Sequence, residues 1–279
     1  MIEVASLEAY KSIVSGFKSG GERALSNCFL MPDEVQRLTA EKKLFALLNS
    51  EWLFLLCDRR DYFSVYYYAF ASSAAETAKG LFEEEKFSKE LLLDVTFRGA
   101  NGDRSTVKTL VSGGVFGEYK IYKRMVLSLR KAEEGEFKTK IAPGYRLEKS
   151  DDYETVLSLW KTGLDEKSTP LPNREAFEAF EREGLFFALK DEKNETACVL
   201  VLNRRGKNAL IEHLVCSPEH RRRGLAKSLF LLALQSAKEM GVLDARLWVD
   251  EKNTPAVSLY EKLGFLDDGT KSEQYIYNR

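Results

Sequence analysis

The sequence predicts an α/β protein built from two similar halves. Short apolar runs that are typical of strands alternate along the chain with segments of helical periodicity. A charged run of low apolar content, residues 132–140, lies near the middle of the 279 residues and suits a linker between two domains of ordinary size. Two stretches of the first half, 52–70 and 91–116, resemble stretches 185–202 and 245–265 of the second half. These observations predict two related domains in tandem.

The composition favours a globular protein with no general affinity for polyanions. Hydrophobic residues make up 44% of the chain and charged residues 30%, with a formal net charge of −1. Overall attraction to nucleic acid or anionic lipid is therefore not expected. Residues 1–14 lack the basic and apolar regions of a secretory signal, and no stretch reaches the ~18–20 apolar residues of a membrane span. We expect a cytoplasmic protein that binds neither nucleic acid nor membrane.

The cysteines and histidines bear on redox state and metal binding. The four cysteines are scattered, and none belongs to a CxxC pair: Cys28, Cys57, Cys198 and Cys216. This pattern predicts reduced thiols. Only two histidines are present, His213 and His220, so we expect no metal site.

The first half alternates helical and strand patterns. Pro32-Asp33 is a suitable helix start, Asp58–Tyr62 can join two strands as a hairpin, and Gly113-Gly114 can end a short helix. The predicted order is helices at 7–17 and 33–48, strands at 52–57 and 63–70, a helix at 75–85, a strand at 91–97, a helix at 107–111 and a strand at 119–129.

The second half carries clearer signals for the ends of its elements. Asn173 is a suitable helix N-cap, and Gly241 and Gly264 can each close a helix. The predicted order is a strand at 145–149, helices at 152–164 and 173–182, strands at 185–189, 196–202 and 209–216, a helix at 224–240, a strand at 245–249, a helix at 254–263 and a strand at 274–277.

The two halves differ in the segment between their matched stretches. About twenty residues separate the stretches in the first half and about forty in the second, a difference of roughly one strand and one loop. We therefore expect the first half to lack the strand and loop at 209–223. The expected domains are 1–131 and 143–279, joined by a linker at 132–142.

The loop that precedes the helix at 224–240 has the composition of an anion-binding site. It reads Arg221-Arg222-Arg223-Gly224-Leu225-Ala226. The first turn of a helix has backbone N–H groups without intrahelical partners, and the helix dipole makes that end partly positive. A pyrophosphate can satisfy these groups if the backbone is accessible, and Gly224 and Ala226 provide that clearance. Arginine side chains can then balance the remaining phosphate charge.

With the segments that follow, this loop resembles the GCN5-related N-acetyltransferase (GNAT) superfamily. The family's phosphate motif is matched by Arg221, Gly224 and Ala226. Its later motif is matched by Asn253, Ala256, Leu259-Tyr260 and Gly264-Phe265. The resemblance covers roughly residues 143–279, and it implies a mixed, mostly antiparallel sheet flanked by helices in each half. It implies acetyl-CoA or another acyl-CoA as the donor, and a first half that is a degenerate GNAT-like domain without the pyrophosphate loop.

The resemblance also assigns roles to individual residues. Backbone amides of the loop and first helical turn are expected to hold the CoA pyrophosphate: Arg222, Arg223, Gly224, Leu225, Ala226 and Lys227. Main-chain groups of Leu214, Val215 and Cys216 are expected to pair with the pantetheine arm, and Asn253 with the pantetheine or the next turn. Tyr260 matches the tyrosine that protonates the departing CoA thiolate, a role that suits a phenolic O–H.

Acyl transfer to an amine also requires a group that removes the amine proton, because an amine with a pKa near ~10 is mostly protonated at neutral pH. Glu212 is the first candidate, since it lies on the strand before the loop, and His213 is the second. Adjacent strand residues face opposite sides, so we expect at most one of them to face the site.

The sequence therefore predicts an N-acetyltransferase that acts on a small-molecule amine or amino acid, as a monomer or homodimer. A CoA-binding sensor or regulatory module without turnover is the alternative. A further alternative is a module that binds RNA or protein through Arg221–Arg223, for which steep salt dependence would be required.

Overall fold

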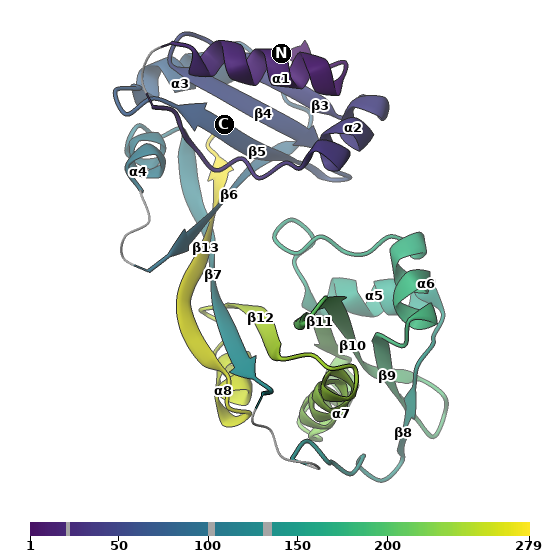
Figure 1. Cartoon of the computed structure of the whole chain (residues 1–279). Coiled ribbons are helices and arrows are strands. Elements are labelled where there is room, and N and C mark those ends of the chain that lie inside the picture. Colours follow the sequence, from purple (N-terminus) through teal and green to yellow (C-terminus); the bar gives the residue numbers. More distant parts are fainter. Residues whose placement is uncertain (21–22, 100–103, 131–135) are drawn as a thin grey trace. The chain divides into compact units, whose positions relative to one another are not determined.

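The structure is a computed structural model that describes residues 1–20, 23–99, 104–130 and 136–279 (Figure 1). The chain forms two compact units. The first unit comprises Met1–Tyr122 and Thr270–Arg279, and the second unit comprises Lys123–Gly269. Among the described residues, no helix combines the length and the apolar content needed to cross a membrane.

The first unit contains one sheet with helices on both faces. Its helices are α1 (Leu7–Lys18), α2 (Pro32–Ala40), α3 (Ala75–Glu83) and α4 (Ser105–Ser112). Its strands are β1 (Ile2–Glu3), β2 (Leu25–Ser26), β3 (Leu44–Leu48), β4 (Trp52–Asp58), β5 (Tyr62–Ala69) and β6 (Glu90–Arg98), and it also holds the first part of β7 (Phe116–Ser128). Strands pair in the order β1-β3-β4-β5-β6, and only β5 and β6 run parallel.

Two apolar layers hold this sheet between its helices. Helices α1 and α2 pack on one face through Val14, Phe17, Val35 and Leu38. Helices α3 and α4 pack on the other face, in a cluster with the buried ring of Phe54. Alternation along the strands supplies both layers, because successive side chains point to opposite faces.

The second unit repeats this arrangement. Its helices are α5 (Tyr153–Gly163), α6 (Arg174–Arg182), α7 (Leu225–Glu239) and α8 (Thr254–Lys262), with a short 3₁₀ helix η1 (Pro218–His220). Its strands are β8 (Tyr145–Glu148), β9 (Phe186–Asp191), β10 (Thr196–Arg205), β11 (Asn208–Cys216) and β12 (Asp244–Asp250), followed by β13 (Leu266–Tyr277), which begins in this unit. Strands pair in the order β12-β11-β10-β9-β8, and only β11 and β12 run parallel.

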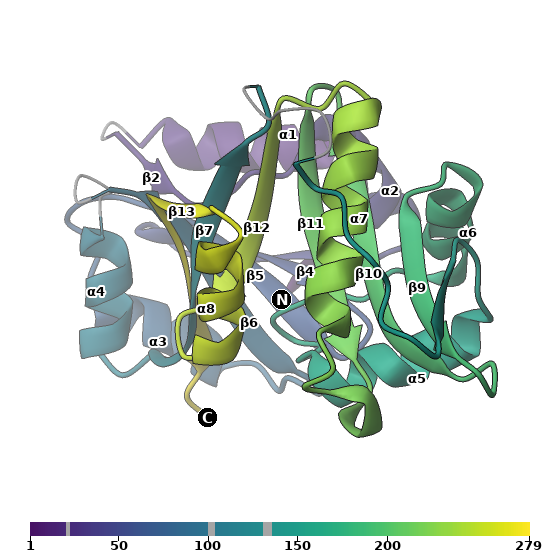
Figure 2. The same ribbon diagram turned by 90° about the horizontal axis from the view of Figure 1, so that it is seen from below.

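Helices again cover both faces of the sheet in the second unit. Trp160 and Phe177 of α5 and α6 pack on one face with Val199 and Val201. Helix α7 packs on the other face and runs along β10 and β11 (Figure 2). The mixed, mostly antiparallel sheets flanked by helices confirm the predicted fold class.

The two units correspond element by element, but not in the predicted register. In chain order, β1-α1-α2-β3-β4-β5-α3-β6-α4-β7 matches β8-α5-α6-β9-β10-β11-α7-β12-α8-β13. The parallel pairs β5–β6 and β11–β12 occupy the same place in the two orders. The sequence comparison had matched 52–70 with 185–202, one strand too early. The expectation that the first half lacks the strand at 209–216 was therefore wrong, because β5 is that strand.

The error arose at residues 33–48, which we expected to form one helix. Helix α2 ends at Ala40, and Lys42 adopts a left-handed conformation with φ 55°. The Lys43 N–H then donates to the Leu38 carbonyl oxygen at 2.8 Å, which closes the helix. Leu44–Leu48 continues as β3, buried against β4. A short apolar run has a spacing compatible with either structure.

The connection between strand and helix does differ between the units. Residues 70–74 join β5 to α3 and contain neither arginine nor glycine, whereas residues 217–224 join β11 to α7. The absence of a pyrophosphate loop from the first half remains a prediction.

The two repeated series of elements, β1 to β7 (the first repeat) and β8 to β13 (the second repeat), do not coincide with the two compact units, because each unit contains part of a strand from the other repeat. Strand β13 begins in the second unit, and its residues Thr270–Ile276 pair with β6 in the first. Strand β7 begins in the first unit, and its residues from Lys123 onward belong to the second. Part of the predicted linker, residues 132–135, lies outside the described residues. The predicted domain division at 132–142 remains a prediction.

Candidate active site

The candidate site is built around β11 and the loop that follows it. Strands β11 and β12 pair through only three residue pairs, from Asn208 with Asp244 to Leu210 with Arg246. Beyond this point β11 continues to Cys216 and β12 to Asp250 without further pairing. The strands therefore diverge, and beyond Leu210 the edge of β11 that faces β12 is not covered by β12. Leu214, Val215 and Cys216, the predicted pantetheine residues, lie in this diverging part.

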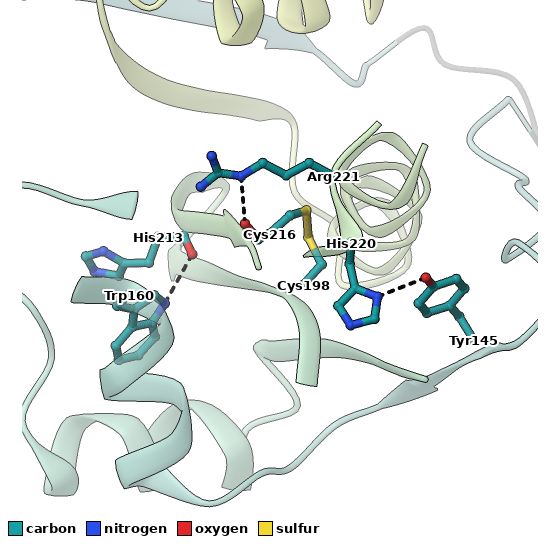
Figure 3. Close-up of a disulfide and its surroundings, with 7 residues drawn as sticks. All are labelled: Tyr145, Trp160, Cys198, His213, Cys216, His220 and Arg221. Carbon is teal, nitrogen blue, oxygen red and sulfur yellow. Dashed lines mark hydrogen bonds between the residues drawn. A yellow bond between two sulfur atoms is a disulfide. The ribbon is translucent and has the colours of Figure 1, made fainter. Parts of the chain in front are cut away.

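A β-bulge interrupts β11 in the same region. Val215 lies opposite Val199 and Glu212 opposite Val201, so His213 and Leu214 together oppose one residue, Leu200. His213 has a left-handed φ of 53°. Its carbonyl oxygen accepts a hydrogen bond from Trp160 Nε1 of α5 at 3.2 Å (Figure 3).

The bulge changes which side chains share a face. Glu212 lies opposite Val201, which packs against α5 and α6. The His213 ring lies 5.3 Å from the Trp160 ring of α5. Both side chains therefore lie on the α5 side, and strict alternation was the wrong assumption here.

These two candidate bases differ in their protonation. Burial raises the pKa of Glu212, although a hydrogen bond from Asn203 Nδ2 to Glu212 Oε2 at 3.0 Å opposes that rise. Burial lowers the pKa of His213 to about 4, and its Nδ1 is buried with no hydrogen-bond partner among the described residues. His213 is therefore neutral near pH 7, and a weak base.

The loop before α7 presents an open helix N-terminus. Gly224 is the N-cap, has a left-handed φ of 77° and makes no side-chain cap. The first intrahelical bond of this turn runs from the Ser228 N–H to the Gly224 carbonyl oxygen at 3.1 Å. The N–H groups of Leu225, Ala226 and Lys227 therefore lack an intrahelical acceptor. A Cβ added at Gly224 would meet no atom within 4 Å, so the space beside this N-cap residue is open.

The three loop arginines are not equivalent. Arg221 Nε donates to the Cys216 carbonyl oxygen at 3.2 Å (Figure 3). Arg223 donates to the Tyr145 hydroxyl at 2.9 Å and to the Glu219 carbonyl oxygen at 3.2 Å. Arg222 is exposed with a left-handed φ of 62°, and its side chain makes no hydrogen bond or ion pair within the described part of the chain. The general expectation that the arginines face phosphate therefore fits Arg222 best.

The later motif residues lie on α8. Asn253 is the N-cap of that helix, and its Oδ1 accepts from the Ala256 N–H at 3.3 Å. Tyr260 packs against Phe230 of α7 and Phe265, with ring centroids 5.3 and 6.3 Å away. Burial raises the pKa of Tyr260 to about 12, so its hydroxyl stays protonated across the neutral range.

A disulfide joins the ends of β10 and β11, so the predicted reduced state is wrong for Cys198 and Cys216 (Figure 3). The two cysteines are direct cross-strand neighbours and belong to the apolar cluster beneath α7. Cys216, whose main chain was expected to bind pantetheine, therefore also holds the start of the loop against β10. Cys28 and Cys57 are free thiols.

Sequence reasoning missed Tyr145, Asp191 and Glu195. Ligand atoms of Asp191, Glu195 and His220 lie within 4.8 Å of one another, the one such group in the described ranges. Asp191 Oδ1 already accepts the N–H groups of Lys193 and Glu195, at 3.0 and 2.8 Å. We therefore assign Asp191 to the structure of the β9–β10 turn. No local motif marks these residues, because the chain brings them together only through strand pairing.

Comparison with known proteins agrees with the geometry of the second unit. Residues 152–265 match the model of the acetyltransferase (GNAT) family. A mycothiol acetyltransferase from Thermobispora bispora is 48% identical over 48 residues, which are 17% of this chain and only 16% of that protein. A GCN5-related N-acetyltransferase structure from Sphaerobacter thermophilus covers 98% of this chain and 91% of its own, at 14% identity and a TM-score of 0.59.

A second solved structure has the same two-part architecture in its description. It is a tandem GNAT protein from the clavulanic acid biosynthesis pathway, and it matches 81% of this chain and 78% of its own with 15% identity and a TM-score of 0.56. At such identities the likeness concerns the fold. The family assignment rests on the matched model, which places residues 152–265 in the acetyltransferase (GNAT) family.

Proposed function

We propose that the second unit transfers an acetyl or other short acyl group from acyl-CoA to a primary amine of a small molecule or amino acid. The observation that carries the proposal is the open N-terminus of α7 beside the diverging end of β11. Three unpaired N–H groups, a left-handed glycine and one free arginine form a donor set that suits a diphosphate. The edge of β11 that β12 leaves uncovered beyond Leu210 suits an extended amide chain such as pantetheine.

Each segment of the site has a proposed role in binding acyl-CoA. Arg222 to Lys227 bind the diphosphate, and Arg221 supports this loop through the Cys216 carbonyl oxygen. Main-chain groups of Leu214 to Cys216 orient the pantetheine arm so that the thioester lies near the bulge. Asn253 holds the start of α8, which carries Tyr260.

Glu212 is the better of the two candidate bases. An effective general base has a pKa close to the working pH. Burial raises the pKa of Glu212 above its usual value and lowers the pKa of His213 to about 4. Glu212 can then take a proton from the amine, directly or through one water, as the nitrogen attacks the thioester carbonyl. The carbon–sulfur bond breaks as the new amide forms.

Tyr260 assists the departure of the thiolate as the general acid. Its pKa of about 12 keeps the proton on the phenol, where it is available to the sulfur. A free thiol titrates near ~8.5, so the phenol is the weaker acid and acts mainly through a hydrogen bond that strengthens as charge develops. Its burial between Phe230 and Phe265 fixes the ring.

A thiol-release assay with acetyl-CoA across a panel of amines tests the proposal. Tyr260→Phe is expected to lower kcat roughly 100-fold, within the range of a general acid, with CoA affinity retained by calorimetry. Tyr153→Phe is the matched control, because it also loses one tyrosine hydroxyl of the second unit, which donates to the Pro172 carbonyl oxygen at 3.0 Å. If CoA binds but no amine releases thiol, the protein is a CoA sensor. If CoA does not bind, the proposal is wrong in both forms.

A further inference from the structure

The loop arginines divide into anchored and free side chains. Arg221 and Arg223 are both hydrogen-bonded to the protein, whereas the exposed Arg222 between them is not, as far as the described residues go. Arg222 also adopts φ 62°, a left-handed conformation that is unfavourable for a residue other than glycine. Contacts on either side must therefore hold the loop in this shape.

The anchor on the helix side depends on one tyrosine from a distant part of the sequence. Tyr145, the first residue of β8, receives a hydrogen bond from Arg223 Nη1 at 2.9 Å. Its hydroxyl also lies 3.0 Å from His220 Nδ1 (Figure 3). A guanidinium group can only donate, so the Tyr145 oxygen accepts from Arg223 and its proton can be donated to His220. One hydroxyl therefore joins two residues of the loop.

His220 is itself held in place. Its ring packs edge-on against the Tyr145 ring, with centroids 5.7 Å apart. Its Nε2 lies 4.0 Å from Asp191 Oδ2, and both side chains are largely buried, with 13% and 15% exposed. With Nδ1 as the acceptor, Nε2 carries the ring proton and faces the carboxylate, which favours this tautomer. Asp191 is fixed in turn by two N–H groups of its own turn.

We infer that Tyr145 is a positioning residue for the anion-binding loop, acting through Arg223 and His220, and that Arg222 is the loop arginine left free to meet phosphate. The inference rests on the proposed function, because it concerns the same CoA site. Tyr145 itself touches no ligand in this scheme. Its hydroxyl sets the affinity for the nucleotide end of acyl-CoA without entering the acyl-transfer step.

The primary test is Tyr145→Phe, which keeps the ring and removes the bridging hydroxyl. We expect the Kd for CoA and the KM for acetyl-CoA to rise about five- to ten-fold, with kcat at saturating acetyl-CoA unchanged. A tyrosine that merely supported the fold would lower stability, and would not separate KM from kcat in this way. Tyr153→Phe, with an equivalent hydroxyl at another place in the unit, should leave both constants at the wild-type value.

A double-mutant cycle separates the anchored arginine from the free one. Arg223→Ala and Tyr145→Phe remove the two ends of one hydrogen bond, so their combined effect on the Kd for CoA should be smaller than the product of the two single fold-changes. Arg222→Ala should also weaken binding, but its effect should add fully to that of Tyr145→Phe.

The histidine supplies a rescue experiment. His220→Asn places an amide oxygen near the position of Nδ1 and should bind CoA within two-fold of wild type. His220→Leu removes the acceptor and should match Tyr145→Phe. Equal defects in the Asn and Leu variants would overturn the inference, as would wild-type affinity in Tyr145→Phe or full additivity with Arg223→Ala. If the unaltered protein shows no heat with CoA, the proposed function itself has failed.

Discussion

Replacing Gly224 by alanine should separate the cost of its backbone conformation from its role in binding. Gly224 and Gly241 lie at opposite ends of α7, with φ 77° and 75°. A Cβ at either position would meet no atom within 4 Å. Alanine at each site therefore carries the same penalty for the left-handed conformation, about 1–2 kcal/mol of unfolding free energy.

The two variants should differ only toward CoA. In Gly224→Ala the added methyl group enters the open space at the N-cap, next to the first-turn N–H groups that we propose bind phosphate. We expect at least a ten-fold rise in the Kd for CoA, which corresponds to about 1.4 kcal/mol. Gly241→Ala should bind CoA with wild-type affinity, because it lies at the other end of the helix.

Urea denaturation and calorimetry with desulfo-CoA measure the two quantities independently. Equal losses of stability with a Kd change in Gly224→Ala alone would support the phosphate loop. If both variants lose stability equally and both retain wild-type Kd, the α7 N-terminus does not hold the pyrophosphate. That result would refute the reasoning even if the protein acetylates an amine by other means.

Two further predictions concern stability. Reduction of the Cys198–Cys216 disulfide, which spans 18 residues, should lower the unfolding free energy by about 3 kcal/mol. Urea denaturation with and without dithiothreitol measures this change, and the Cys28→Ala/Cys57→Ala variant, which keeps only the disulfide cysteines, is the control. Equal stability in both conditions would contradict the prediction. The lowered pKa of His213 means that the unfolded chain takes up a proton between pH 6.5 and about 4 while the folded chain does not. The unfolding free energy should therefore fall as the pH drops through that window, by on the order of 3 kcal/mol in total. In His213→Gln this fall, measured by denaturation at pH 4, 5 and 7, should be smaller. An identical pH profile in the variant would exclude His213 as the cause of the fall.

Most helices and strands of the second half form close to where the sequence predicted them. Helices expected at 152–164, 173–182 and 254–263 appear as α5, α6 and α8, and the strand expected at 209–216 appears as β11. These elements have local end signals, such as the Asn173 cap, whose Oδ1 accepts from the Ala176 N–H at 2.9 Å. In the first half, β3 has no such signal. Its apolar run continues the spacing of α2, so the missing strand shifted the whole comparison between the repeats.

The disulfide illustrates a limit of a different kind. Near the turn, β10 and β11 pair Arg205 with Asn208 and Arg204 with Ala209. Continued without interruption, this register would place Cys216 opposite Ala197. The bulge at His213 shifts the register by one residue and brings Cys216 opposite Cys198. The positions of the two cysteines in the sequence do not predict this pairing, because it depends on a β-bulge elsewhere in the strand.

Tyr145 could not be found from sequence for a related reason. It lies 75 positions from His220 and 78 from Arg223. Its contacts depend on β8 pairing at the edge of the sheet with β9, which also carries Asp191. The motif of the loop identifies where an anion could bind, but not what holds the loop in place.

Residues Thr270–Arg279 belong to the first unit, although the segment before them, Lys123–Gly269, forms the second unit. Thr270–Ile276 pairs with β6 of the first unit, and the end of β7, from Lys123 onward, belongs to the second unit. In the sheet, β12 lies between β11 and β7. A protein fragment with only the second repeat would therefore lack β7 beside β12, and its residues Thr270–Ile276 would lack their partner β6. We therefore expect that the second repeat does not fold stably when it is separated from the first, because each repeat completes the sheet of the other.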